Sequence, residues 1–125
     1  MPIDLTNLDL DLTFLQEIAD GSDEFMVETI DMFLQQTPVS LQEINDAMDA
    51  ADWTTAGAAA HKMKSTLGFF GMLNSQALIQ KIETSCKTGA PNATKVTEQF
   101  KQVEATLAEN LVALAQIKEE KEAKL

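Results

Sequence analysis

The sequence predicts an all-α protein, an antiparallel up-and-down four-helix bundle with one or two extra N-terminal helices. Three observations favour this class. Helix-forming residues dominate the 125 residues, only five glycines and three prolines occur, and no run alternates apolar and polar residues for long. Apolar residues recur instead at steps of three and four. The connections are short, which favours antiparallel neighbours.

The first helices are predicted from their end signals. A helix is expected from about Asp11 to Ala19, closed by Gly21, and Ser22 has the side-chain oxygen to cap the next one. Pro38 is expected to break that helix or to restart it. The stripe before this proline comprises Phe25, Met26, Thr29, Ile30, Phe33 and Leu34, and the stripe after it comprises Leu41, Ile44, Ala47 and Met48.

Three more helices complete the bundle. Asp52 caps a helix that is expected to run to about Phe70, and the next opens at Asn74 or Ser75 and ends at Gly89. The latter turns Leu78, Ile79, Ile82 and Cys86 inward. The last and longest helix starts at Pro91 and buries Val96, Phe100, Val103, Leu107, Leu111, Leu114 and Ile117.

One domain, residues 1–125, accommodates all these elements. Hydrophobic residues make up 45% of the chain, which is enough for a single core. Residues 1–10 form a lead-in. Residues 118–125 are almost all charged, so we expect this tail to fray. A single bundle uses most of the apolar stripes, and a monomer is therefore expected.

The charge of the chain is strongly negative and unevenly distributed. Twenty acidic residues and nine lysines give a net charge of −11, which disfavours binding to nucleic acid or to an anionic membrane. Residues 1–60 contain 13 acids and no base, whereas residues 61–125 contain 7 glutamates and 9 lysines. This pattern fits a solvated acidic surface. Alternatively, Lys62 and Lys64 form a small positive spot that could receive an anion.

Cysteine and histidine are too scarce for several kinds of site. Cys86 is the sole cysteine, which excludes an internal disulfide and indicates a reducing, cytoplasmic compartment. With one histidine in addition, no zinc site of the usual ligands is expected, and we predict no metal or cofactor. The longest uncharged run, residues 67–80, is too short and too polar to span a bilayer.

The predicted helix from Asp52 to Phe70 carries the residues that could take part in a chemical reaction. Its core seam follows steps of 3, 4, 3, 4 and 3 through Trp53, Ala56, Ala60, Met63, Leu67 and Phe70. His61 lies one residue off this seam, a rotation of about 100°. It shares a face with Lys64, Ser65 and Gly68, at spacings of three, four and seven residues.

Small residues surround His61, namely Gly57, Ala58, Ser65 and Gly68. Each glycine inside a helix costs roughly 1 kcal/mol relative to alanine, so two of them need a reason. Close helix packing is one reason, and clearance for a second protein is another. A neutral imidazole is a good nucleophile, and Lys64 is suited to neutralise a phosphoryl group, with a hydrogen bond from Ser65. The alternative is a surface histidine without a role.

The run from Ala60 to Gly71, AHKMKSTLGFFG, resembles the signature of histidine-containing phosphotransfer (HPt) domains. That signature is A-H-x-[LM]-K-[GS]-[SA], with a glycine ten residues after the histidine. Upstream positions also fit the family pattern, namely Gly21, Asp23, Phe25, Phe33, Pro38, Leu41, Ala47, Asp52 and Trp53. The chain departs from the family at Ser65, where glycine is commoner, and in a minor way at Thr66. A serine is still small, so we expect altered docking detail and retained activity.

The resemblance implies specific residue roles. His61 would be the phosphoacceptor, modified on Nε2, and Lys64 would steady the phosphoryl charge. Glu83, 22 residues after the histidine, would hold Nδ1 and so fix the tautomer. The alternative for Glu83 is an exposed acid beside Cys86 and Lys87.

The resemblance also implies partners. These are response-regulator receiver domains, which would bring Mg²⁺, and a hybrid sensor histidine kinase. Gly57, Ala58, Gly68, Phe69 and Met72 are candidates for the docking face. Phe14 and Leu15 are further candidates. The alternative for Phe69, Met72, Phe14 and Leu15 is a position in the hydrophobic core, which suits each of them at least as well.

Three functions therefore compete. The first is a phosphoryl carrier that takes a phosphoryl group from one receiver aspartate and passes it to another. The second is a helical adaptor without phosphotransfer, which the presence of His61 and Lys64 disfavours. The third is an enzyme such as an ATP-using kinase. The absence of a Walker loop and of a G-x-G-x-x-G motif disfavours the enzyme, so we expect no autophosphorylation with ATP.

Overall fold

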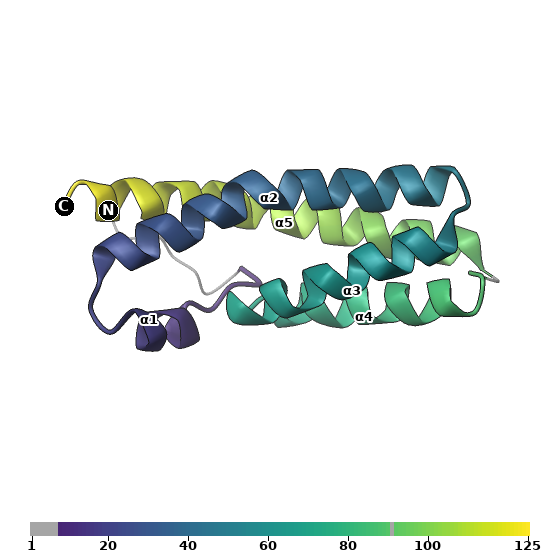
Figure 1. Ribbon diagram of the computed structural model, residues 1–125, viewed down its shortest axis with the longest axis horizontal. Helices are drawn as coiled ribbons and strands as arrows, with labels where there is room; N and C mark the ends of the chain where they lie inside the picture. The colour runs from purple at the N-terminus through teal and green to yellow at the C-terminus, as the bar shows by residue number, and fades with distance from the viewer. Residues whose placement is uncertain (1–7, 91) are drawn as a thin grey trace.

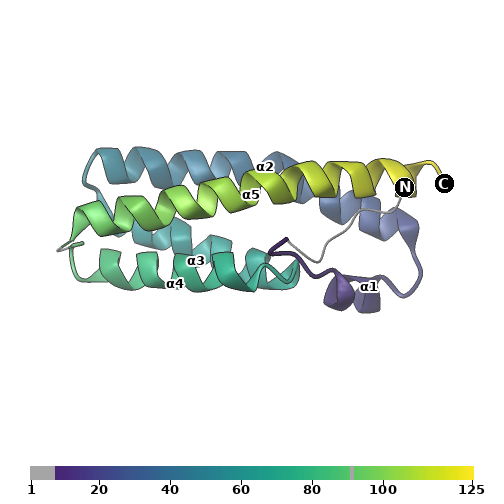
Figure 2. The ribbon, with the colours of Figure 1, turned by 180° about the vertical axis from the view of Figure 1, so that it is seen from behind.

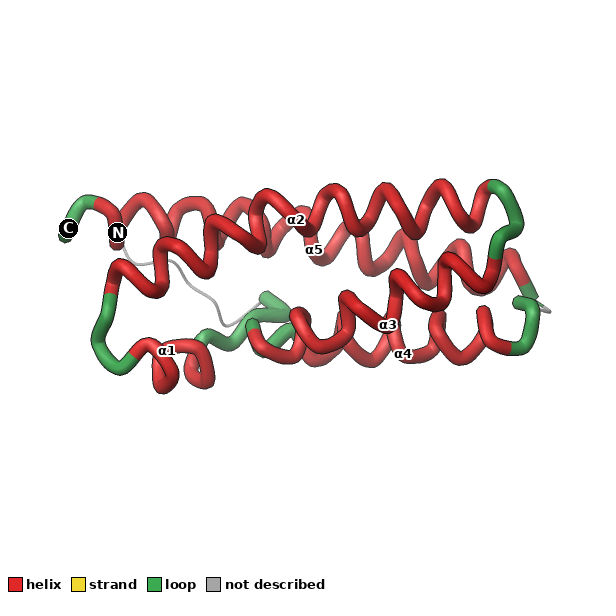
Figure 3. The backbone as a smooth tube through the Cα atoms, in the orientation of Figure 1, coloured by secondary structure: helices red, strands yellow, loops and turns green. Residues whose placement is uncertain are grey.

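The computed structural model describes residues 8–90 and 92–125, and within these ranges the chain is helical without strands. Two long helices, α2 and α5, lie side by side, and the shorter pair α3 and α4 packs against them (Figure 1; Figure 3). The α2–α5 pair extends beyond the α3–α4 pair, and the short α1 occupies the space below this extension (Figure 1). The helices are α1 (Thr13–Ala19), α2 (Asp23–Asp49), α3 (Trp53–Phe69), α4 (Leu73–Lys87) and α5 (Ala93–Glu122). The predicted class is confirmed, with one extra N-terminal helix.

The residue directly before the helix caps α2, α3 and α5 with its side chain. Ser22 Oγ accepts a hydrogen bond from the Phe25 amide at 3.1 Å, as predicted. Asp52 Oδ1 likewise accepts from the Thr55 amide at 3.2 Å. Asn92 caps α5, and Pro91, where this helix was expected to start, lies outside the described residues. Helix α4 begins at Leu73, slightly before the predicted Asn74 or Ser75.

The prediction that Pro38 interrupts the second helix is wrong. Helix α2 is continuous through Pro38, whose ring is on the exposed side. A proline inside a helix removes one backbone hydrogen bond. Helix α2 has buried residues on both sides of that position, among them Phe33 and Ile44, and tertiary burial outweighs the local preference.

Helix α5 continues to Glu122 and so includes most of residues 118–125, the tail that is expected to fray. Lys118 Nζ lies 2.8 Å from Asp31 Oδ1, and Lys121 Nζ lies 3.4 Å from Asp23 Oδ1. Both aspartates belong to α2, so charges at the end of the chain tie α5 to the acidic first half. These partners are 87 and 98 residues away in sequence, so the composition of the tail alone does not indicate them.

The core follows the predicted stripes. The seam of α3 is buried from Ala56 to Phe70, with Trp53 partly buried at its start. Fully buried side chains from the other elements include Leu15, Met26, Ile30, Ile44, Ile79, Ile82, Phe100, Leu107 and Leu114. With the core filled by one bundle, the exposed face of α3 is left for other uses.

The segment before α1 ties three helices together. The Asp9 carboxylate accepts hydrogen bonds from the amides of Asn74 and Ser75, at 2.9 and 2.7 Å, and thereby caps α4. Its backbone carbonyl accepts from Asn110 Nδ2 of α5 at 2.9 Å. Gly71, in the turn after α3, has φ +66° and faces the Asp11 backbone. A side chain at Gly71 would collide with that backbone, so this turn requires glycine.

Candidate functional site

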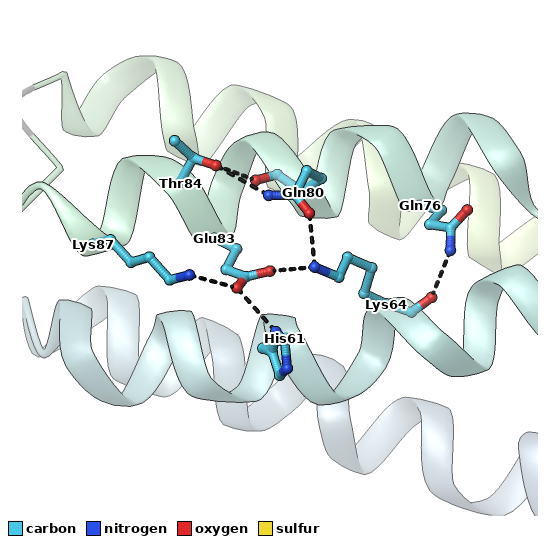
Figure 4. Close-up of polar contacts among 7 residues, drawn as sticks. All are labelled: His61, Lys64, Gln76, Gln80, Glu83, Thr84 and Lys87. Atoms are coloured by element: carbon cyan, nitrogen blue, oxygen red, sulfur yellow. Dashed lines mark hydrogen bonds and ion pairs between the residues drawn. The ribbon is translucent and has the colours of Figure 1, made fainter.

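The site lies where α3 and α4 run side by side (Figure 2), and Figure 4 shows its side chains. His61 and Lys64 come from α3, and Gln80, Glu83 and Lys87 come from α4 (Figure 4). The helices approach closely one turn before His61, because Gly57 has no side chain. A Cβ at Gly57 would lie 3.1 Å from Cys86 Cβ.

Glu83 is the centre of the polar cluster. Its side chain is only 2% exposed, yet three groups contact its two oxygens. Oε2 lies 2.9 Å from His61 Nδ1 and 3.1 Å from Lys87 Nζ. Oε1 lies 3.0 Å from Lys64 Nζ. Glu83 is therefore a buried carboxylate with its charge compensated, and the alternative of an exposed acid is wrong.

These contacts keep Glu83 ionised. The hydrogen bond from Lys64, together with those from Lys87 and His61, lowers the pKa of Glu83 from 4.5 to about 2, against the opposing effect of burial. An ionised carboxylate only accepts hydrogen bonds. The hydrogen atom in the contact with His61 must therefore be on Nδ1.

His61 is consequently arranged as a nucleophile. With the hydrogen on Nδ1, the lone pair of a neutral ring is on Nε2. The side chain is 65% exposed, and Nε2 is on the ring edge that points away from Glu83 (Figure 4). Within residues 8–90 and 92–125, no hydrogen-bond partner contacts Nε2. This nitrogen is thus free to react.

Lys64 is held beside the ring and not on its reactive edge. Its ammonium donates to Gln80 Oε1 at 2.7 Å as well as to Glu83. The Lys64 carbonyl accepts from Gln76 Nε2 at 3.2 Å. Gly68 makes room for that amide, since a Cβ at Gly68 would lie 2.5 Å from Gln76 Nε2. The clearance predicted at Gly68 is therefore partly filled by the chain itself.

Some of the expected docking residues are on the surface. Ala58 and Ser65 are exposed on α3, and Phe69 is half-buried. Phe14 of α1 is 53% exposed and packs edge-on against Phe69, with ring centroids 5.4 Å apart. Between α2 and α3 there is also a groove, lined in part by Met32, Ser65 and Phe69. Phe14, Met32 and Phe69 thus give a partly exposed apolar surface along α3, the helix that also carries His61.

Three other candidates are buried and cannot contact a partner. Met72 is fully buried because it occupies the turn that starts α4. Leu15 is fully buried on the inner side of α1, and Gly57 faces Cys86 on α4. Their assignment to the docking face is corrected.

The positive spot expected at Lys62 and Lys64 is divided by the geometry of α3. Residues two apart on a helix do not share a face. Lys62 lines the groove toward α2, whereas Lys64 faces α4. The cation that joins Lys64 at the site is Lys87.

Neither Gln80 nor Lys87 was predicted to belong to the site, although Lys87 was expected beside Glu83. Each is on the same face of α4 as Glu83, three residues before it and four residues after it. The helical spacing around Glu83 would have indicated that both belong to the site.

Two further properties bear on the kind of site. The described part of the chain gathers no group of three acidic, histidine or cysteine side chains that could hold a metal ion. Across the same residues, none of the helices combines the length and the apolarity that crossing a membrane requires.

A helical bundle with an exposed, carboxylate-braced histidine and an adjacent lysine defines a class, the histidine phosphotransfer module. The family model described as Hpt domain matches residues 28–120 of the chain. Comparison of the chain with curated proteins and with solved structures found no match. The match covers most of the chain, and the chain belongs to the Hpt domain family. Hpt domains are phosphotransfer carriers of two-component signalling and are not themselves catalytic enzymes.

Proposed function

We propose that the chain relays a phosphoryl group between receiver domains through His61 Nε2. The observation that carries this proposal is the contact of His61 Nδ1 with the ionised Glu83, at 2.9 Å, on a ring that is 65% exposed. It supplies a free lone pair on the solvent side. The upstream donor would be the receiver domain of a hybrid sensor histidine kinase, and the acceptor would be a response-regulator receiver.

The transfer step is a displacement at phosphorus. The Nε2 lone pair attacks the phosphorus of an aspartyl phosphate, the P–O bond breaks, and its electron pair leaves with the receiver carboxylate. The hydrogen stays on Nδ1, so the ring gains a positive charge. Glu83 stabilises that charge across the 2.9 Å contact. Transfer to the next receiver is the reverse of this step.

Lys64 and Ser65 have supporting roles in this proposal. The Lys64 ammonium would turn from Glu83 and Gln80 to the phosphoryl oxygens, and the hydroxyl of Ser65, one turn after His61, would donate a hydrogen bond. The chain would need no cofactor of its own, because the receiver brings Mg²⁺ and the remaining catalytic groups.

A receiver would dock on the apolar surface along α3. The small, exposed Ala58 allows close approach to α3, and Phe14, Met32 and Phe69 provide apolar contact from three helices. We place the chain in the cytoplasm as a monomer, where the free thiol of Cys86 would stay reduced.

A transfer assay with a phosphorylated receiver and Mg²⁺ tests this function. We expect acid-labile, base-stable label on the chain, and none in His61→Gln. Lys64→Met should slow transfer roughly 10- to 100-fold, the effect of one charge-assisted hydrogen bond. Lys101→Met removes an exposed lysine of α5, outside the docking surface, and should leave the rate unchanged. Absence of label from every receiver would favour an adaptor, and label from ATP alone would indicate an enzyme.

A further inference from the structure

Lys87 is a second cation on Glu83 that the proposed transfer does not yet use. Its Nζ lies 3.1 Å from Oε2, the oxygen that also accepts from His61 Nδ1. The side chain of Lys87 is 70% exposed, whereas that of Lys64 is 26% exposed. Lys87 therefore covers Glu83 on the solvent side, and Lys64 does so from within the α3–α4 interface.

The two lysines leave the cluster with a surplus of positive charge. With a neutral imidazole, Lys64, Lys87 and Glu83 sum to one net positive charge, on a chain whose net charge is −11. No other charged side chain of the described residues lies within ion-pair distance of Glu83. This surplus is local and is suited to an incoming phosphoryl group.

Lys64 has two duties that conflict, if the proposed function holds. Its ammonium is bound to Glu83 and Gln80, while the phosphoryl group would be on Nε2, at the other edge of the ring (Figure 4). When Lys64 turns to the phosphoryl group, Glu83 loses the partner that contributes most to its ionisation. A buried carboxylate without a cation is costly.

We propose that Lys87 is a positioning residue of the phosphotransfer site. It stays on Oε2 of Glu83 and keeps that carboxylate ionised against Nδ1 of His61 while Lys64 turns to the phosphoryl group. This inference rests on the proposed function, and it assigns to Lys87 the role of the cation that remains at Glu83 during the transfer. Lys87 does not itself contact the reacting atoms.

Removal of Lys64 imitates its departure and allows a test without a phosphoryl group. Nitrogen NMR of the His61 ring at about pH 8 reports the tautomer. We expect the Nδ1–H form in Lys64→Met and its loss in Lys64→Met with Lys87→Met. Lys87→Arg in the Lys64→Met background should keep it, and so should Lys81→Met, an exposed lysine of α4 without an ion pair among the described residues. Thermal melts confirm that each variant is folded.

The opposite results overturn the inference. If the double variant retains the Nδ1–H form, Glu83 needs no second cation. If Lys64→Met alone loses it, Lys87 is insufficient.

A second measurement follows the phosphorylated protein. Phosphoramidate, a small phosphoryl donor, is used to phosphorylate His61 without a receiver, and phosphorus NMR gives the half-life of the phosphohistidine. Lys87→Met should shorten it about two- to fivefold, the range for an exposed ion pair. Lys87→Arg should restore it, and Lys81→Met should not change it. In about 1 M salt the difference should shrink, because the charge is screened.

The outcomes separate the two proposals. Equal half-lives in Lys87→Met and the unsubstituted protein overturn the role of Lys87 and leave the transfer intact. Absence of phosphohistidine in the unsubstituted protein overturns both.

Discussion

At the scale of single residues, Glu83 determines how the site is arranged. One of its oxygens orients the His61 ring and the other holds Lys64, so the tautomer and the position of the cation depend on the same carboxylate. The side chain is buried, and its ionisation depends on its three partners. Loss of its charge should therefore affect both stability and chemistry.

Glu83→Gln should lower the free energy of unfolding at pH 7 by about 1–3 kcal/mol, the range for hydrogen bonds to charged groups. The pKa of Glu83 is depressed to about 2 from 4.5, so this carboxylate stabilises the fold fully above about pH 4.5. That stabilisation is lost as the pH falls from 4.5 through 2. The variant should thus lose less stability than the unsubstituted protein in this interval. Urea unfolding at a series of pH values measures the difference.

Glu104→Gln is a matched control, because Glu104 is an exposed glutamate of α5. It should follow the unsubstituted protein across the whole pH range. An equally steep acid dependence in Glu83→Gln would mean that Glu83 is not held ionised by its partners.

At the scale of elements, the helices and their caps could be predicted from local signals. Period and end residues are properties of a short window, and Ser22 and Asp52 cap helices as expected. The continuity of α2 through Pro38 and the ion pairs that join the end of α5 to α2 could not be predicted in this way. They depend on contacts between segments far apart in the sequence.

The site could likewise be predicted only as far as local spacing allows. Helical spacing placed His61 and Lys64 on the α3 face outside the core seam, where the structure has them. Spacing does not say which helix covers that face. Gly57 and Met72 were misassigned for this reason, since one faces α4 and the other occupies a tight turn.

The close approach of α3 and α4 depends on Gly57. Gly57→Val should lower the free energy of unfolding by about 1–3 kcal/mol, because the added groups overpack the contact with Cys86. Separation of the helices should also weaken the contact of His61 with Glu83, which nitrogen NMR of the ring detects. Ala58→Val, at an adjacent exposed position, should cost less than about 1 kcal/mol. Equal effects of the two substitutions would contradict this role of Gly57.

At the scale of the whole molecule, the segment before α1 connects the elements that carry the site. Asp9 joins the start of α4 to α5, and Asp11 donates its amide to the Phe70 carbonyl at 3.1 Å, at the end of α3. This segment and α1 precede residue 28, where the family match begins. The hydrogen bonds at the end of the α3–α4 hairpin therefore come from a segment that lies outside the family match.

Asp9→Ala should lower the free energy of unfolding by about 1–2 kcal/mol, because α4 loses its N-terminal cap. Amide hydrogen exchange in the first turn of α4 should accelerate at the same time. Glu17→Ala, at an exposed position of α1, should change neither quantity. If Asp9→Ala is as stable as Glu17→Ala, these hydrogen bonds do not contribute to stability.

The site differs in charge from the rest of the molecule. Residues 1–60 have 13 acids and no base, and the pairs of Lys118 with Asp31 and of Lys121 with Asp23 compensate part of that charge. Lys64 and Lys87 are concentrated instead around one buried glutamate. An anionic molecule thus presents a local positive site next to its reactive imidazole.

Nitrogen and phosphorus NMR of the histidine-labelled protein, after incubation with a phosphorylated receiver and Mg²⁺, tests the central claim most directly. We predict a phosphoryl group on Nε2 of His61, with the hydrogen retained on Nδ1 toward Glu83, and no such signal in His61→Gln. A phosphoryl group on Nδ1, or one that persists in His61→Gln, would contradict the claim.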